Sequence, residues 1–337
     1  MVLVGHVNGG IRVSFGRWVQ LDRRTFRMCQ PSVVEEAKSA ERSRPVERNQ
    51  SVWRAFRARC GTPVGSVREI VQSKEVFEAD ALILGETHDD PVAHELEKEM
   101  FRELTEVPKR KPILSMEILE RDVQLVVDEY MQGAIRESDF KANARLPFNY
   151  DSDYRALVEM AKERQVQVLA ANAPRRYVAL ARRVGRENLE SSLPAAARSF
   201  LPPLPYAAAS EQYAHKFSKI MAVLRGDASK PQPAPPGLLD AQSLWDASMA
   251  HAICSAAKKG QLKASSDRPL VFHIGGGFHV EHGLGIAEHI PKYGEGIRIA
   301  TVVIQPGSTD EPFDPKKHKD IADFIIITDE NVPRSYE

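Results

Sequence analysis

Between residues 81 and 185, short apolar runs alternate with stretches in which apolar residues recur every three or four positions. The apolar runs are residues 81–84, 113–116 and 166–171. Each run has the length and composition of a strand that is buried on both faces. The stretches between them have the spacing of amphipathic helices and end at glycines such as Gly133 and Gly185. This alternation predicts an α/β fold, with a mainly parallel sheet covered by helices on both faces.

The pattern changes between about residues 193 and 236. Two proline-rich runs exclude regular helix or sheet there, and they flank a helical stretch over residues 207–225. We expect this part to be a helical insertion, a lid subdomain within one α/β domain that spans residues 51–337. The later elements of the domain are a helix over residues 238–260 and strands over residues 270–274, 297–304 and 324–327.

The first 50 residues differ from the rest in charge. Residues 1–34 contain five arginines and one acidic residue, Asp22, which is the composition of an organelle transit peptide. Residues 35–50 are highly charged and are typical of a linker. We therefore expect a disordered, basic N-terminus that directs the protein to a chloroplast or mitochondrion; the alternative is a basic tail on a cytoplasmic protein.

The overall composition narrows the classes of partner. The formal net charge is zero, so the charge balance gives no indication of nucleic-acid binding. The three cysteines are scattered and form neither a metal-binding motif nor a disulfide framework. No apolar run approaches the roughly 20 residues of a transmembrane segment. We expect a small-molecule ligand rather than nucleic acid or a membrane.

Polar side chains follow three of the predicted strands. Glu86 and His88 follow the first strand, Glu117 follows the second, and His279 comes after the glycine run 275–277. The carboxyl ends of parallel strands meet at one edge of a sheet, so these side chains are expected to converge there. Glycines in such a place let the backbone approach a bound group. Two carboxylates with two imidazoles suit a divalent or ferrous ion, or the activation of water.

Each of these residues also has an ordinary structural explanation. Glu86 and His88 could belong to a solvated turn beside the helix start that Asp90-Pro91 predicts. Glu117 could favour the N-terminus of the next helix. We expect His94 on the surface of the first helical turn and His273 in the core with a hydrogen-bond partner. We expect His282 and His289 on a solvent-exposed segment.

Several enzyme classes are excluded by missing motifs. The glycine run lacks the third glycine of a dinucleotide fingerprint and lies late in the chain, which argues against a nicotinamide enzyme. The chain has no Gly-x-Ser-x-Gly elbow and no Walker loop.

Taken together, the motifs resemble the ChaN family of haem-binding uptake proteins in the wider Tiki/TraB superfamily. The resemblance runs from about residue 80 to residue 304 and includes Leu84-Gly85-Glu86-Thr87-His88 and Gly276-Gly277-Phe278-His279. Further matching segments are residues 116–124, 130–133, 170–175 and 239–252. The resemblance implies a parallel α/β core with a helical insertion, and haem held between two subunits. Superfamily relatives include metal-dependent proteases and hydrolases similar to erythromycin esterases.

The sequence also departs from the family pattern. It has no lipoprotein cysteine after an apolar leader, which argues against a periplasmic iron-uptake role, and Phe278 replaces a glycine found in many bacterial members. The haem-ligating tyrosine cannot be placed by motif. Tyr206, Tyr213 and His215 in the insertion are candidates, although ordinary packing would also explain them.

Three hypotheses follow. The first is a haem- or iron-binding protein, not necessarily an enzyme, with cofactor contacts from His88, Gly276, Gly277, Tyr213, His215 and His279. The second is a metal-dependent hydrolase in which Glu86, His88, Glu117 and His279 bind metal and Glu86 or Glu117 is the base. The third is a scaffold without catalytic activity. The resemblance also makes a homodimer an expectation.

Overall fold

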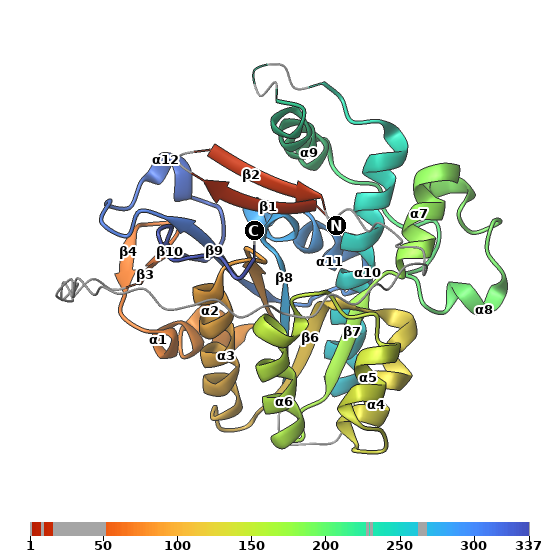
Figure 1. The fold of residues 1–337 in the computed structure, drawn as a ribbon, viewed down its shortest axis with the longest axis horizontal. Coiled ribbons are helices and arrows are strands. Elements are labelled where there is room, and N and C mark those ends of the chain that lie inside the picture. Colours follow the sequence, from red (N-terminus) through yellow and green to blue (C-terminus); the bar gives the residue numbers. More distant parts are fainter. Residues whose placement is uncertain are drawn as a thin grey trace, which may run out of the picture.

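The computed structural model describes residues 2–7, 10–15, 52–226, 229, 232–261 and 268–336. Eight strands form one sheet in the order β4-β3-β10-β9-β5-β8-β6-β7 (Figure 1). The strands are β3 Trp53–Arg57, β4 Thr62–Val64, β5 Ala81–Glu86, β6 Arg110–Glu120, β7 Val168–Asn172, β8 Arg268–Gly276, β9 Ile299–Gly307 and β10 Phe324–Asp329. Strands β5 to β10 run parallel, and only β3 and β4 pair antiparallel at one edge. The predicted α/β fold with a mainly parallel sheet is confirmed.

Helices cover both faces of this sheet (Figure 1). They are α1 Val67–Val71, α2 Lys74–Glu78, α3 Pro91–Thr105, α4 Gln124–Met131, α5 Glu137–Asn143, α6 Arg155–Glu163, α7 Arg175–Val184, α8 Ala195–Arg198, α9 Glu211–Leu224, α10 Pro236–Gln261, α11 Ile286–Tyr293 and α12 Pro315–His318. Leu82 and Leu84 of β5 pack in a cluster with apolar residues of α1, α3, α4 and α6. Ala81 and Ile83, which point to the opposite face, pack in a cluster with α10 and α11. The uninterrupted apolar run of β5 is thus buried on both faces.

Three strands extend further than the sequence pattern predicts. The structure continues β5 through Gly85 to Glu86, β6 to Glu120 and β8 through Gly275 to Gly276. The predicted strand 81–84 ends before Gly85, which we expected to break it. This expectation is wrong, because Gly85 continues β5 and, as a glycine, lets the backbone of another segment approach closely. A Cβ atom at Gly85 would lie 2.8 Å from the Cα atom of Gly277. The strand β6 does become irregular between Met116 and Glu120, where its register to β7 shifts.

The segment around residues 193–236 contains α8 and α9. Helix α9 begins at a serine N-cap, since the Ser210 side chain accepts a hydrogen bond from the Tyr213 amide. Its buried side chains Tyr213 and Phe217 pack against Phe278, which directly follows β8. Helix α9 therefore lies over the chain segment that leaves the carboxyl end of β8.

The N-terminal segment is described only in part. Strands β1 Val2–Val7 and β2 Gly10–Phe15 form a separate antiparallel pair, in a region for which we expected no regular structure. Residues 16–51 lie outside the described residues. They include most of the arginines of residues 1–34 and the predicted linker. The transit peptide stays a prediction. Within the described part of the chain, no helix combines the length and apolarity needed to span a membrane.

The helix start at Asp90 and Pro91 is confirmed, and it generates a stability prediction. Asp90 is fully buried, and its Oδ1 accepts hydrogen bonds from the amides of Val92 (3.0 Å) and Ala93 (3.3 Å). Its Oδ2 accepts a hydrogen bond from the Thr328 hydroxyl and lies 3.3 Å from Arg334 Nη1.

An ordinary N-cap contributes about 1 kcal/mol, and we expect Asp90→Ala to lower the free energy of unfolding by more than this amount. The loss is larger because the substitution also removes the acceptor of Thr328 and the ion-pair partner of Arg334. Urea denaturation measures the loss. Ser66→Ala, which removes the exposed cap of α1, is the matched control and should cost about 1 kcal/mol or less. Equal losses in the two variants would contradict the tertiary role of Asp90.

Candidate functional site

The predicted site residues meet at the carboxyl ends of β5, β8 and β6. Strand β8 is inserted between β5 and β6, so the three ends are neighbours although the chain visits them far apart. Glu86 lies opposite Gly276 in the register of β5 with β8, and Glu117 follows the pair formed by Met116 and Ile274. The side chains nevertheless form two separate hydrogen-bonded groups, which we call the Glu86 group and the His279 group.

The Glu86 group lies between β5, α3 and the start of α6. Glu86 Oε1 accepts a hydrogen bond from the Tyr154 hydroxyl at 2.6 Å and lies 2.7 Å from His88 Nδ1. Glu86 Oε2 lies 3.2 Å from His94 Nδ1. Burial by itself would raise the pKa of Glu86, but the charge of His94 and the hydrogen bond to His88 outweigh burial and hold the pKa well below its usual range. Glu86 is therefore an ionised carboxylate whose Oε1 is engaged by Tyr154 and His88.

His94 and Glu97 complete this group, and both were missed in the sequence. The expectation that His94 is a surface residue is wrong, because its side chain is only 5% exposed. His94 Nδ1 lies 3.1 Å from Glu97 Oε2, and its Nε2 lies 3.1 Å from the carbonyl oxygen of His88. A signal was present, since residues 94, 97, 101 and 104 share one helical face that includes the buried Phe101 and Leu104.

The His279 group lies on the other side of β8. His279 Nδ1 is 2.6 Å from Asp246 Oδ1, and Asp246 Oδ2 accepts a hydrogen bond from the Tyr213 hydroxyl. His279 Nε2 lies 3.8 Å from Glu117 Oε1, and Glu117 Oε2 accepts a hydrogen bond from the Gly276 amide at 2.6 Å. Sequence reasoning missed Asp246, although it is polar at a position of α10 whose neighbours Met249 and Ala250 are buried.

The charges of this group support one another. Burial alone would lower the pKa of His279, but Asp246 and Glu117 outweigh it and raise that pKa. Burial of Glu117 is likewise outweighed, and the nearby His279 and His88 lower its pKa. The site thus favours a positive charge on the His279 ring, between two carboxylates.

Glycines set the distance between the two groups. A Cβ atom at Gly275 would lie 2.7 Å from Glu117 Oε2, and one at Gly276 would lie 3.0 Å from His88 Nε2. The side chains of Glu117 and His88 therefore pack directly on the backbone of β8. No larger residue fits at these positions while Glu117 and His88 stay in place.

Two hollows open at this edge of the sheet, and His279 lines both. The first lies beside α9 and is lined by Glu86, His88, Ile220, Gly276, Gly277 and Phe278, among others. The second lies beside α10 and is lined mainly by Glu117, Ile118, Arg145, Pro147, Arg175 and Trp245. The His279 ring is the element that the two hollows share.

The remaining candidates lie in different environments. His273 is a fully buried core residue whose Nδ1 lies 2.9 Å from the Ser115 hydroxyl, as expected. His282 is exposed as expected, whereas His289 is buried on α11, where only 1% of it is exposed. In the insertion, His215 is exposed on α9. Tyr206 is buried and donates a hydrogen bond to the Asp240 carbonyl oxygen at 2.7 Å.

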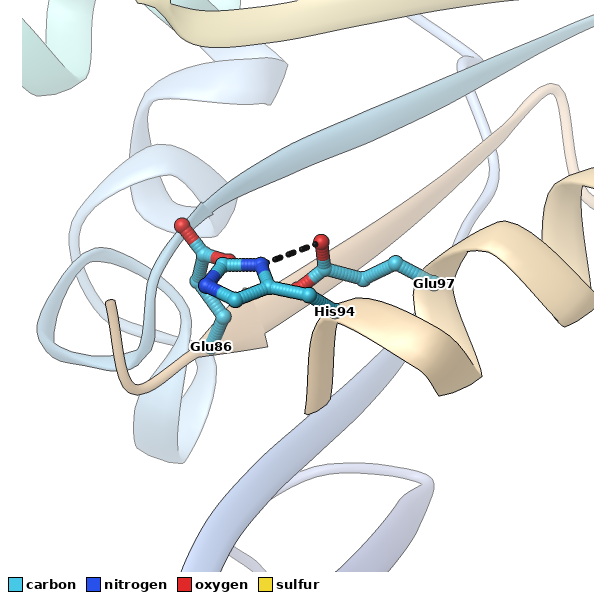
Figure 2. A group of neighbouring side chains, drawn as sticks. All are labelled: Glu86, His94 and Glu97. Atoms are coloured by element: carbon cyan, nitrogen blue, oxygen red, sulfur yellow. Dashed lines mark hydrogen bonds and ion pairs between the residues drawn. The ribbon is translucent and has the colours of Figure 1, made fainter. Parts of the chain in front are cut away.

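The four residues predicted to bind one metal ion do not form one cluster. Within the described residues, the group that brings three donor atoms within 4.8 Å of one another is Glu86, His94 and Glu97 (Figure 2). Glu86 shares its carboxylate with His88, but Glu117 and His279 belong to the other hydrogen-bonded group. The predicted metal set is thus divided between two places.

Comparisons with known proteins agree with the sequence resemblance. Residues 73–290 match the model of the haem-binding uptake family ChaN of the Tiki superfamily. A solved structure of ChaN from Campylobacter jejuni, with cofacially bound haem, is 16% identical, has a TM-score of 0.59 and covers 83% of this chain and 98% of that one. A Bacillus cereus protein is 13% identical with a TM-score of 0.38, covering 72% and 70% of the two chains. No curated protein matches significantly. At such identities the structural likeness shows the fold alone.

The His279 group generates a prediction about charge. Asp246→Asn removes the carboxylate that lies against His279 Nδ1, so the pKa of His279 should fall, as measured by an NMR titration of the histidine ring signals. Tyr213→Phe is the control, because it removes a hydrogen-bond donor but leaves the Asp246 charge in place. A His279 pKa that is unchanged in Asp246→Asn would show that the two side chains do not interact in solution.

A second prediction concerns His273. Burial lowers its pKa to about 4, against about 6.5 in an unfolded chain. The neutral ring therefore stabilises the fold fully above pH 6.5, and this contribution, up to about 3 kcal/mol, is lost as the pH falls toward 4. His273→Gln, which cannot titrate, should flatten the acid side of the stability–pH curve. The exposed His282→Gln variant should leave the curve unchanged, and equal curves for all three proteins would contradict the assignment.

Proposed function

The chain belongs to the ChaN family of haem-binding uptake proteins in the Tiki superfamily, and we propose that it binds haem at the carboxyl edge of its sheet. The observation that carries the proposal is the pair formed by Asp246 and His279. His279 Nδ1 faces the Asp246 carboxylate at 2.6 Å, while the same ring lines both hollows of the site. Haem iron in proteins is commonly held by an imidazole nitrogen.

The orientation of His279 fits the role of an iron ligand. A carboxylate accepts but does not donate, so Nδ1 carries the hydrogen. Nε2, which lies 3.4 Å from the side-chain amide of the buried Gln242, is the ring atom that could bind a metal if this amide gives way. Metal-ligating histidines usually have this arrangement, in which a carboxylate fixes the tautomer and raises the basicity of the ring. The neighbouring Glu117, 3.8 Å from Nε2, favours positive charge there. In the free protein a proton supplies the positive charge at Nε2. An iron cation would also bring positive charge to this position.

The second hollow has the chemistry that a haem requires. Ile118, Pro147 and Trp245 offer an apolar surface for the porphyrin, which is flat and largely apolar. Arg145 and Arg175 line the same hollow and match the charge of the propionates, although both are paired with Glu120, at 2.8 Å and 3.7 Å. These residues suit haem in their chemistry, with His279 as the proposed iron ligand, but the hollow holds only about 20 Å³ and must open to admit a porphyrin.

The insertion residues have other roles in this proposal. The Tyr213 hydroxyl already donates to Asp246 and is fully buried, so Tyr213 positions the Asp246–His279 pair and does not itself reach iron. His215 is exposed on α9 and is the competing ligand for a haem bound outside the hollows. His88 and the glycines of β8 form the wall of the first hollow.

The hydrolase hypothesis gains no support from the same geometry. Tyr154 and His88 occupy Oε1 of Glu86, and the Gly276 amide occupies Oε2 of Glu117. The four residues that a hydrolase would need are divided between two groups, and they are not the group whose donor atoms lie within 4.8 Å of one another. We propose a protein that carries or stores haem. The Campylobacter jejuni protein binds haem cofacially, and haem held between two copies of this chain is part of this proposal.

Titration of the purified protein with hemin tests the proposal. We expect a Soret band shifted from that of free hemin, and an affinity at least tenfold weaker in His279→Ala, because the axial ligand is lost. The exposed variants His215→Ala and His282→Ala should bind as the parent does. Light scattering with and without hemin reports whether two copies assemble.

The outcomes separate the alternatives. No Soret shift at tens of micromolar protein would overturn haem binding altogether. Loss of binding in His215→Ala, with His279→Ala unaffected, would place the haem on the outer surface of α9 instead.

A further inference from the structure

A second cluster of potential metal ligands lies on the side of β5 that faces away from the proposed haem ligand. Figure 2 shows the His94 ring between the carboxylates of Glu86 and Glu97, with Glu86 at the end of β5 and the other two residues on α3. The side chains of Glu86, His94 and Glu97 are 1%, 5% and 1% exposed. The proposed haem site uses neither His94 nor Glu97.

Two of the three distances between the donor atoms match those of a coordination shell. His94 Nδ1 lies 3.2 Å from Glu86 Oε2 and 3.1 Å from Glu97 Oε2. Ligands at about 2.1 Å from one ion lie roughly 3.0 Å apart in octahedral and roughly 3.4 Å apart in tetrahedral geometry. All three donor atoms lie within 4.8 Å of one another.

The hydrogen-bond partners of His94 direct a lone pair into the group. His94 Nε2 lies 3.1 Å from the carbonyl oxygen of His88, which only accepts, so Nε2 carries a hydrogen. In the free protein the charged ring carries its second hydrogen on Nδ1, between two carboxylate oxygens, and a metal ion would replace that hydrogen. Three electron pairs that converge in a buried place require a positive charge between them.

Two oxygens of the group give independent support. Glu86 Oε2 and Glu97 Oε1 accept no hydrogen bond, although both are buried. Buried carboxylate oxygens without a donor are costly and rare, and a bound ion is one of their recognised explanations. Glu86 Oε2 is also one of the three atoms that point at the same spot.

We propose that Glu86, His94 and Glu97 bind a divalent first-row transition metal ion. Two carboxylates and one imidazole suit Fe²⁺, Mn²⁺ or Zn²⁺ better than Ca²⁺ or Mg²⁺, which prefer oxygen ligands alone. The ion would join the end of β5 to the first turns of α3. Because Glu86 also bonds to His88 and Tyr154, the ion would fix the orientation of His88 at the edge of the first hollow.

A shared proton is the competing explanation for the same contacts. Burial and the neighbouring Glu86 raise the pKa of Glu97 well above its usual range, so a protonated Glu97 beside a charged His94 would also balance the group. The two explanations differ at Glu97. An amide replaces a protonated carboxylic acid with little loss, but it removes a negative ligand from a metal ion.

The experiment uses the full chain, purified without chelators and without added haem. Elemental analysis should find about one transition metal ion per chain. After removal of that ion, Co²⁺ should bind and give visible ligand-field absorption, and Mn²⁺ or Zn²⁺ should raise the melting temperature by several degrees. Glu97→Gln should bind Co²⁺ at least tenfold more weakly. Glu95→Gln, an exposed change on the same helix, should behave as the parent chain does.

Two results would overturn the proposal. One is a parent chain that shows neither cobalt absorption nor a metal-dependent melting temperature. The other is a Glu97→Gln variant that binds Co²⁺ as tightly as the parent chain. If Glu97→Gln does not fold, the cobalt spectrum of the parent chain decides alone. Because the hemin titration measures His279 and this experiment measures His94 and Glu97, failure of one proposal leaves the other standing.

Discussion

The close approach of β5 to the end of β8 is the constraint on which the site depends. Gly85 meets Gly277 at a distance that excludes any side chain, and Gly275 and Gly276 leave room for Glu117 and His88. This contact brings two carboxylates and two imidazoles to one edge of the sheet. It also keeps them apart, because the backbone of β8 runs between the Glu86 group and the His279 group. The site therefore consists of two groups of side chains, which the backbone of β8 separates.

Burial of so many charged groups is tolerated because each carboxylate has a positive or donating neighbour. Glu86 has His88, His94 and Tyr154, and Glu117 has His279 and the Gly276 amide. An unpaired buried charge would cost several kcal/mol, whereas hydrogen-bonded pairs recover most of that cost. Such pairs are seldom the most stable solution for a core. Their concentration at the carboxyl edge agrees with a binding role.

The two groups differ in their surroundings, which suggests that they have different roles within the ChaN fold. The His279 group borders both hollows, presents an imidazole backed by Asp246, and lies beneath α9. The Glu86 group is largely buried and connects β5 to α3. Glu86 and His88 belong to this group and also line the first hollow, so through these two residues the group can influence a ligand that binds there.

Local sequence determined the elements, because apolar runs, helical spacing and caps act over a few residues. The strand at 81–84, the start of α3 at Asp90 and the amphipathic α6 all followed from such patterns, and ordered motifs identified the family. The positions of side chains that contact one another across the fold needed the tertiary structure. His94 was misplaced, and Asp246 and Glu97 were overlooked, because their burial depends on which element packs opposite them. His94 and Glu97 are buried because α3 packs beside β5 and Tyr154, and Asp246 is buried because α10 packs on β8. No local pattern encodes which element packs opposite these residues.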